Sequence, residues 1–480
     1  MAINSFPFFA LFAVVFILYF LPFRRHKVTY QNGVLLLASY YFYGFADMRM
    51  LPLLVGVTLV FYYIGIGIEK YEDTKRADHL LLLGVVLGVG MLVYFKYTNF
   101  FIQSFSDLLA CFGLQTNWHS LKIIVPLGIS FFIFRLVSYV IEVHRGMMTA
   151  TRDFIAFAAY VAFFPCMLSG PIDRPNIFIP QLTRSRDFQY DTAVTGLRQI
   201  LWGLFKKMVV ADNLAQFVDF YLGNGGGTAT GSTTIVVALA YTFQIYADFS
   251  GYSDMAIGVG KLLNINVAKN FNYPFFALNI ADFWRRWHMS LTSWVTDYVF
   301  TPLNFSFRKW RQWGMIVAII INFLIVGLWH GASWNYVIYG LYHGLLFVPL
   351  ILLGKMSSSN VIRTNRLGLP VISDFLRMLL TFVLVVFGML IFRCNSINQF
   401  VAELGSLRLG FFSIPDIGVI TNWLFVFVMV LVEWCHRNRD NGLEICYMKS
   451  KPLRWSIYLI LILVIFLNGG ETTGFIYQVF

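Results

Sequence analysis

Charged residues are scarce in this chain: Asp, Glu, Lys and Arg together make up 12% of its 480 residues. A water-soluble domain carries about 25%, so this scarcity excludes an ordinary soluble protein. The chain also lacks the alternation of polar and apolar residues over about 10 positions that marks membrane β-barrel strands. Instead, 58% of its residues are hydrophobic, and they form runs of about 20, enough to cross a hydrocarbon core of about 30 Å as helices. We therefore predict an all-α, polytopic integral membrane protein.

Cysteine is also sparse. None of the five cysteines stands in a C-x-x-C pattern, which excludes zinc-ribbon and thioredoxin-like motifs and leaves the redox compartment open; they are Cys111, Cys166, Cys394, Cys435 and Cys446. The sequence shows no internal repeat, low-complexity tail or separate soluble domain. We expect no metal site and no permanently bound cofactor.

Acidic residues are outnumbered, and the net charge is +12. This excess could suggest nucleic acid, but the Lys and Arg residues cluster in short loops between apolar runs. Such clusters mark the cytoplasmic side of membrane proteins. We expect contact with membrane lipid, no nucleic-acid partner, and a multi-pass location in a membrane.

The apolar runs predict roughly 11–12 transmembrane helices in a single membrane domain over 1–480. Within it we expect N-terminal helices over 1–145, a core with re-entrant segments over 146–354 and C-terminal helices over 355–480. The run from Ile3 to Leu21 lacks a preceding basic region and a cleavage site, so it is interpreted as a retained helix. Segments near 153–170 and 275–300 are interrupted by Pro, Gly or charge and are typical of re-entrant or interfacial helices.

The stretch from Asp282 to Asp297 is predicted to form one strongly amphipathic helix. At 100° per residue its aromatic side chains share one arc, its acids and both arginines share the other, and His288 lies on the border. One interpretation is an interfacial anchor, with Trp in the headgroup belt and Arg pairing lipid phosphate. The other is the wall of a polar funnel.

His330 lies inside the longest stretch without charge. From Gly314 to Gly354 there is no Asp, Glu, Lys or Arg, and one helix of that length would be about 60 Å long. The chain must therefore bend, most naturally at 331–333, directly after His330. Ionisable residues within membrane spans are functional candidates, and a neutral imidazole can act as a general base, although a lone buried His is also a common structural residue.

Other polar residues also lie in apolar surroundings. Asp248 and Asp254 either line a substrate path or hold together a helix interrupted at Ser250 and Gly251. His343 follows His330 by 13 positions, a spacing that does not suit a helical metal pair. In the broken segment before 175, Asp173 and Arg174 can pair.

Four stretches together resemble the membrane-bound O-acyltransferase (MBOAT) superfamily, in particular its bacterial branch of alginate O-acetylation and D-alanyl teichoic-acid transfer proteins. They are FFPCMLSGPIDRPNIFIPQL (163–182), YADFSGYSDMAIG (246–258), ADFWRRWHMSLTSWVTDYVFTPL (281–303) and GLWHGASWNYVIYGLYHG (327–344). The resemblance implies acyl transfer in a bacterial cytoplasmic (inner) membrane. The core over 146–354 would be catalytic, with His330 as the catalytic histidine and His288 as the second histidine. It also implies helices around a central funnel or tunnel, with the donor entering from the cytoplasm and the acceptor from outside. The tail departs from the alginate-type pattern after Tyr477, which puts its partner contact in doubt.

The expected reaction is O-acetylation of an exported polysaccharide or peptidoglycan. Arg285 and Arg286, helped by Lys206, Lys207 and other basic residues, would bind the phosphates of an acyl thioester donor, either acetyl-CoA or an acyl carrier. Asp248, Trp329 and Asn335 complete the expected substrate site. His330 would be either a general base or a nucleophile. The acceptor would be an extracytoplasmic glycan or a periplasmic acetyltransferase partner. D-alanyl transfer to teichoic acid is the alternative within the family, and a transporter, flippase or non-catalytic scaffold is the alternative outside it.

Overall fold

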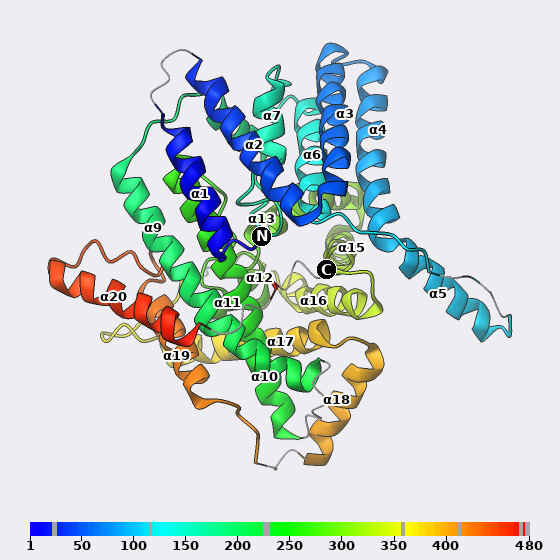
Figure 1. The fold of residues 1–480 in the computed structure, drawn as a ribbon. Coiled ribbons are helices and arrows are strands. Elements are labelled where there is room, and N and C mark those ends of the chain that lie inside the picture. The colour runs from blue at the N-terminus through cyan, green and yellow to red at the C-terminus, as the bar shows by residue number, and fades with distance from the viewer. Residues whose placement is uncertain are drawn as a thin grey trace. The chain divides into compact units, whose positions relative to one another are not determined.

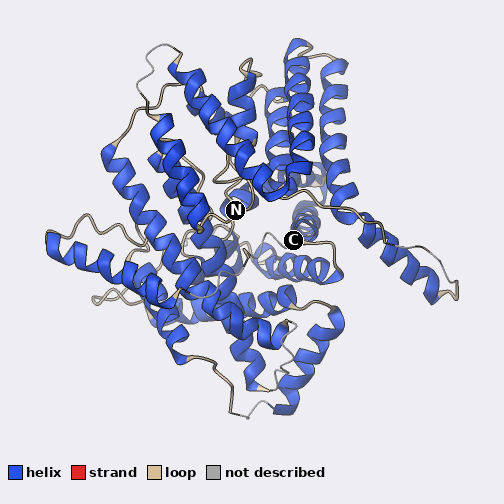
Figure 2. Cartoon of the chain, viewed as in Figure 1, coloured by secondary structure: helices blue, strands red, loops and turns tan. Residues whose placement is uncertain are grey.

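Helices dominate the computed structural model, which describes residues 1–21, 26–114, 118, 120–223, 231–356, 361–410, 414–469 and 474–475. These residues form no β-strand beyond an isolated bridge between Thr364 and Pro370 (Figure 2). The contacts divide the chain into two units. Unit 1 comprises 1–197 and 256–268, and unit 2 comprises 198–255 and 269–480. The prediction of an all-α fold is confirmed.

Unit 1 contains the N-terminal helices (Figure 1): α1 (Phe6–Tyr19), α2 (Lys27–Asp47), α3 (Leu51–Lys70), α4 (Lys75–Leu92), α5 (Thr98–Cys111), α6 (Ile129–His144), α7 (Phe154–Val161), α8 (Pro175–Leu182) and the first part of α9 (Tyr190–Leu204). Helices α3, α4 and α6 pack against one another, and α2 packs on α7. Helix α7 ends at Val161 and irregular turns continue to residue 170, so the predicted interruption of the segment near 153–170 is confirmed.

Unit 2 contains α10 (Asp212–Leu222), most of α11 (Ser232–Leu262), α12 (Ile280–Trp284), α13 (Met289–Val295), α14 (Thr301–Ser306), α15 (Arg311–His330), α16 (Trp334–Leu352), α17 (Ile372–Arg393), α18 (Ile397–Gly410), α19 (Ile420–Cys435) and α20 (Lys451–Asn468). A π-helical turn, Phe205–Ala211, joins α9 to α10. Helix α16 packs against both α15 and α17.

Six helical segments in the described part of the chain are long and apolar enough to cross a membrane. They are Lys27–Lys70, Lys75–Cys111, Arg308–His330, Trp334–Leu352, Ile372–Arg393 and Lys451–Asn468, and two shorter apolar helices are α1 and α19. A polytopic membrane fold is therefore confirmed. The higher count of 11–12 crossings and the single domain with three parts stay predictions.

The predicted bend after His330 is confirmed. Helix α15 ends at His330, and α16 begins at Trp334. The two helices form a tight hairpin because glycines let their backbones meet. A Cβ on Gly340 would lie 2.3 Å from the carbonyl oxygen of Phe323, and one on Gly327 would lie 2.1 Å from that of Tyr336.

The prediction of one continuous helix from Asp282 to Asp297 is wrong. Helix α12 ends at Trp284, His288 adopts a left-handed backbone conformation with φ 44°, and α13 begins only at Met289. The helical wheel assumed continuous backbone, whereas tertiary hydrogen bonds stabilise a turn at 285–288. The polar and aromatic residues of this stretch therefore do not form two faces of one helix.

Candidate active site

His330 occupies the C-terminal end of α15 and is 2% exposed. Three aromatic rings surround its imidazole. Phe392 of α17 lies 5.0 Å away, Tyr339 of α16 lies 6.0 Å away and the neighbouring Trp329 lies 4.9 Å away, all measured between ring centroids. The side chain is thus held among aromatic rings from α15, α16 and α17.

His288 is completely buried, and its turn is tied to the loop before it by Asn270. The Met289 backbone N–H donates to the Asn270 carbonyl at 2.8 Å, and the Ser290 hydroxyl donates to the Asn270 side-chain oxygen at 2.5 Å. The Asn270 amide in turn donates to Ser253 of α11 at 3.0 Å. Asn270 was missed from the sequence because nothing in its surroundings indicates contacts 19 and 20 positions away.

Trp329 connects the two histidines. Its indole lies 5.5 Å from the His288 ring and 4.9 Å from the His330 ring, edge to face in both cases. On its other side the His288 ring packs on Phe249 of α11 at 4.6 Å. The structure therefore brings His288, Trp329 and His330 into one buried cluster, as expected of a shared site.

The two arginines between α12 and α13 have different surroundings. Arg286 donates to Asp282 at 2.9 Å, and the same carboxylate accepts from the Leu278 backbone N–H at 3.0 Å. Arg285 is exposed and donates to the Met356 carbonyl at 2.6 Å. Arg286 is thus held by an ion pair, and Arg285 is the more accessible of the two.

Asn335 is buried at the start of α16, and its amide donates to the carbonyl of Cys394. Cys394 directly follows α17, which carries Phe392. Asn335 therefore fixes the end of α17 beside His330, a positioning contact that the sequence did not reveal.

Asp248 lies in a buried ion cluster. The Lys207 ammonium is 2.7 Å from Asp248 and 2.7 Å from Asp212, and all three side chains are almost completely buried. The neighbouring Lys206 lies 2.6 Å from Asp254. The predicted interruption at Ser250 and Gly251 is wrong, because α11 is continuous through both residues. The two aspartates instead pair α11 with the lysines of the Phe205–Ala211 turn. These pairs also argue against Lys206 and Lys207 as a positive surface for donor phosphates, because both ammonium groups are occupied by carboxylates.

Of the C-terminal tail, the structure describes residues 474–475. Phe475 packs over the Lys207 ammonium at 4.4 Å and against Tyr252 at 4.8 Å. The partner contact of the tail, at 476–480, falls outside the described residues.

In the broken segment of unit 1, Asp173 faces Arg135 at 3.5 Å and accepts a hydrogen bond from the Ala268 N–H at 2.8 Å. Burial raises the pKa of Asp173 to about 6, and Arg135 opposes that rise.

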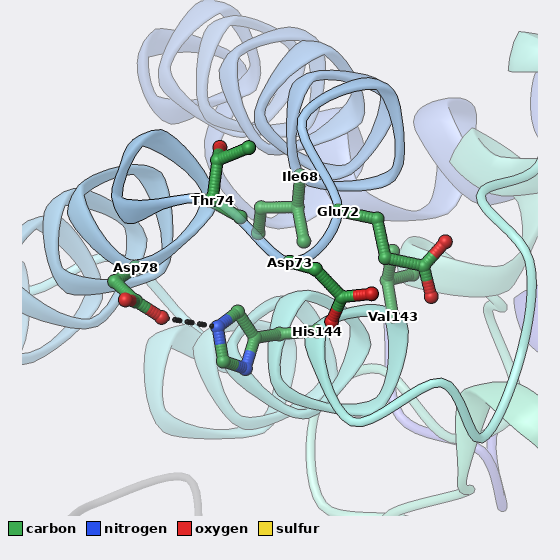
Figure 3. Close-up of a pocket in the computed structure, with 8 residues that line it drawn as sticks. Ile68, Glu72, Asp73, Thr74, Asp78, Val143 and His144 are labelled. Atoms are coloured by element: carbon green, nitrogen blue, oxygen red, sulfur yellow. Dashed lines mark hydrogen bonds and ion pairs between the residues drawn. The ribbon is translucent and has the colours of Figure 1, made fainter.

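Metal-ligating residues do not converge anywhere in the described ranges, where no group of three His, Cys, Asp or Glu could hold an ion. A cavity of 210 Å³ lies in unit 1 between the α3–α4 turn and the end of α6 (Figure 3). It is lined by Glu72, Asp73 and Asp78, and His144 contacts Asp78 at 2.9 Å. None of these residues belongs to the four motifs.

Comparison with known proteins identifies the family of the chain. Residues 148–393 match the model of MBOAT, the membrane-bound O-acyltransferase family. The probable alginate O-acetylase AlgI of Pseudomonas aeruginosa is 38% identical over 406 residues, which cover 83% of this chain and 73% of the relative. The peptidoglycan O-acetyltransferase of Helicobacter pylori is 34% identical over 340 residues, 65% of this chain and 62% of the relative.

A third relative represents the other branch. The teichoic acid D-alanyltransferase of Bacillus subtilis is 31% identical over 227 residues, which cover 44% of this chain and 55% of the relative. The apolar helices and the relatives together define a multi-pass membrane acyltransferase. The chain belongs to the membrane-bound O-acyltransferase family.

Proposed function

We propose that this protein O-acetylates an extracytoplasmic polysaccharide from the bacterial inner membrane. The acetyl group would come from a cytoplasmic thioester such as acetyl-CoA, and the acceptor would be a glycan hydroxyl or a periplasmic partner that passes the group on. The observation that carries the proposal is the buried cluster of His288, Trp329 and His330. The relatives named as O-acetylases match more of the chain than the D-alanyltransferase does.

In the proposed reaction His330 either removes the proton of the acceptor hydroxyl or carries the acyl group itself. The aromatic rings around it exclude water, which protects the thioester from hydrolysis. His288, which contacts the indole of Trp329, would orient the reacting groups or relay a proton. Arg285 would bind donor phosphate, since a guanidinium suits phosphate oxygens. Asp248, Arg286 and Asn335 would support the site through the contacts described above.

The decisive test uses purified protein in proteoliposomes with radiolabelled acetyl-CoA inside and a glycan acceptor outside. We expect His330→Ala to insert normally and lose acetyl transfer. His79→Ala serves as the matched control, because His79 is exposed in unit 1. Wild-type transfer by the His330→Ala protein would overturn the assignment. Label that crosses the membrane unchanged would indicate a transporter, and a D-alanyl carrier thioester that outcompetes acetyl-CoA would indicate the other branch of the family.

A further inference from the structure

His343 is a fully buried histidine outside the proposed pair. It lies in the middle of α16, and its Nδ1 accepts a hydrogen bond from the indole N–H of Trp284 at 3.3 Å. An indole nitrogen can only donate, so Nδ1 must present its lone pair. The neutral His343 ring therefore carries its proton on Nε2, and its tautomer is fixed by Trp284.

Trp284 is the last residue of α12 and precedes His288 by four positions. Its ring packs on Phe323 of α15 at 5.0 Å and on His343 at 5.1 Å. The hydrogen bond to His343 thus attaches the start of the turn at 285–288 to the hairpin of α15 and α16. The position of the His288 turn depends on this attachment on one side and on Asn270 on the other.

A second contact leads from His343 to His330. The Tyr339 ring lies 4.6 Å from His343 and 6.0 Å from His330, and Phe392 packs on both Tyr339 and His330. One imidazole therefore touches the groups that support each member of the histidine pair.

Gly388 of α17 makes room for this arrangement. A Cβ at Gly388 would lie 2.6 Å from Nε2 of His343. Because Nε2 is at the end of a ring held by Trp284 and Tyr339, it has little freedom to retreat. Helix α17 therefore packs directly against His343, so a third element of the site contacts the same ring.

We propose that His343 is a positioning residue that sets the placement of His288 relative to His330, through Trp284 on one side and Tyr339 on the other. This inference rests on the proposed roles of the two histidines. It assigns His343 no contact with donor or acceptor. Its imidazole acts as a hydrogen-bond acceptor of fixed geometry in the core of unit 2.

The test compares three single variants and one double variant, with kcat and the donor KM measured in proteoliposomes. His343→Leu leaves the buried Trp284 N–H without its acceptor, whereas His343→Asn can offer an oxygen near the position of Nδ1. Trp284→Phe removes the donor. A displacement of about 1 Å at a reacting group costs about 100-fold in rate, so we expect His343→Leu to lower kcat by about 10- to 100-fold with donor KM within about twofold.

We expect His343→Asn to keep kcat within about fivefold of the wild type, and the double variant His343→Leu/Trp284→Phe to be more active than His343→Leu, because no orphaned donor remains. If His343→Leu is poorly folded, Trp284→Phe decides the matter: loss of the hydrogen bond should lower its kcat with the donor KM within about twofold, and a wild-type kcat overturns the inference. Wild-type kcat in His343→Leu overturns the inference. Equal losses in the Leu, Asn and double variants overturn it as well, since they would show a role independent of the hydrogen bond.

Failure of the proposed function has a different appearance. It shows as full activity in His330→Ala, or as a wild-type protein that transfers D-alanyl and not acetyl groups. The His343 series is therefore run with both thioesters, so that the ratio of each variant to the wild type is measured with the donor that the protein uses.

Discussion

The imidazole of His288 and the indole of Trp329 lie edge to face, with ring centroids 5.5 Å apart. Trp329 is also the residue directly before His330, at the end of α15. A ring in a helix that ends at the site thus contacts a histidine from a turn 41 positions earlier in the chain. One buried indole therefore contacts both histidines.

Position 329 should therefore tolerate only another aromatic residue. We expect Trp329→Phe to keep measurable acetyl transfer, and Trp329→Ala to abolish it and to lower the free energy of unfolding by about 3–5 kcal/mol through the cavity it leaves. Initial rates and thermal unfolding in detergent measure both effects. Trp313→Ala is the matched control on the same helix, since Trp313 is 66% exposed. Equal behaviour of Trp329→Phe and Trp329→Ala would contradict this role.

His288 carries a backbone requirement in addition to its chemistry. Its φ of 44° lies in the left-handed region, which Asn tolerates better than other residues with a side chain. We expect His288→Asn and His288→Ala both to lose most activity, and His288→Asn to be the more stable by about 1 kcal/mol. Thermal unfolding and acetyl transfer separate the two effects. Full activity in His288→Asn would show that the imidazole is not needed.

The bend at 331–333 could be predicted because a simple length argument decides it: the uncharged stretch is too long for one bilayer crossing. The turn at 285–288 could not be predicted in the same way. The residue pattern of 282–297 suits a helix, whereas hydrogen bonds to distant residues, among them Asn270 and His343, favour the turn. Local periodicity in the sequence therefore predicts which segments are helical. Contacts between residues distant in the sequence determine where each helix ends.

The site residues show the same division. Motif resemblance and the cost of burying an ionisable group both pointed to His330, whose catalytic role stays a prediction. Asp248 stayed ambiguous in the sequence because its partner Lys207 is 41 positions away and was expected at a surface. A buried charge is informative only together with its partner, and the partner is a property of the fold.

The ion cluster around Lys207 leads to a stability prediction. Lys207→Met leaves Asp212 and Asp248 without their shared cation, which costs about 3–5 kcal/mol for a broken buried pair. Asp248→Asn should cost less, because Lys207 keeps its pair with Asp212 at 2.7 Å. The double variant Lys207→Met/Asp248→Asn should be more stable than Lys207→Met alone. Thermal unfolding in detergent provides the measurement.

A control for this series is Arg49→Met, which removes the exposed ion pair between Arg49 and Asp47. Exposed pairs contribute little, so no measurable change is expected. A Lys207→Met protein as stable as the wild type would show that the carboxylates take up protons at little cost, and that the cluster does not hold the helices together.

The glycine contact between α15 and α16 links packing to activity most directly. At Gly340 an added Cβ would lie 2.3 Å from the carbonyl oxygen of Phe323, and a backbone atom cannot move aside as a side chain can. Gly340→Ala should therefore separate the two helices, cost about 1–3 kcal/mol, and lower acetyl transfer by displacing His330 at the end of α15. Gly56→Ala in α3 is the control, because its Cβ meets no atom within 4 Å and alanine favours a helix. We expect Gly56→Ala to unfold at the wild-type temperature or above. If Gly340→Ala matched it in both stability and rate, the close approach of the two helices would not be what holds His330 in place.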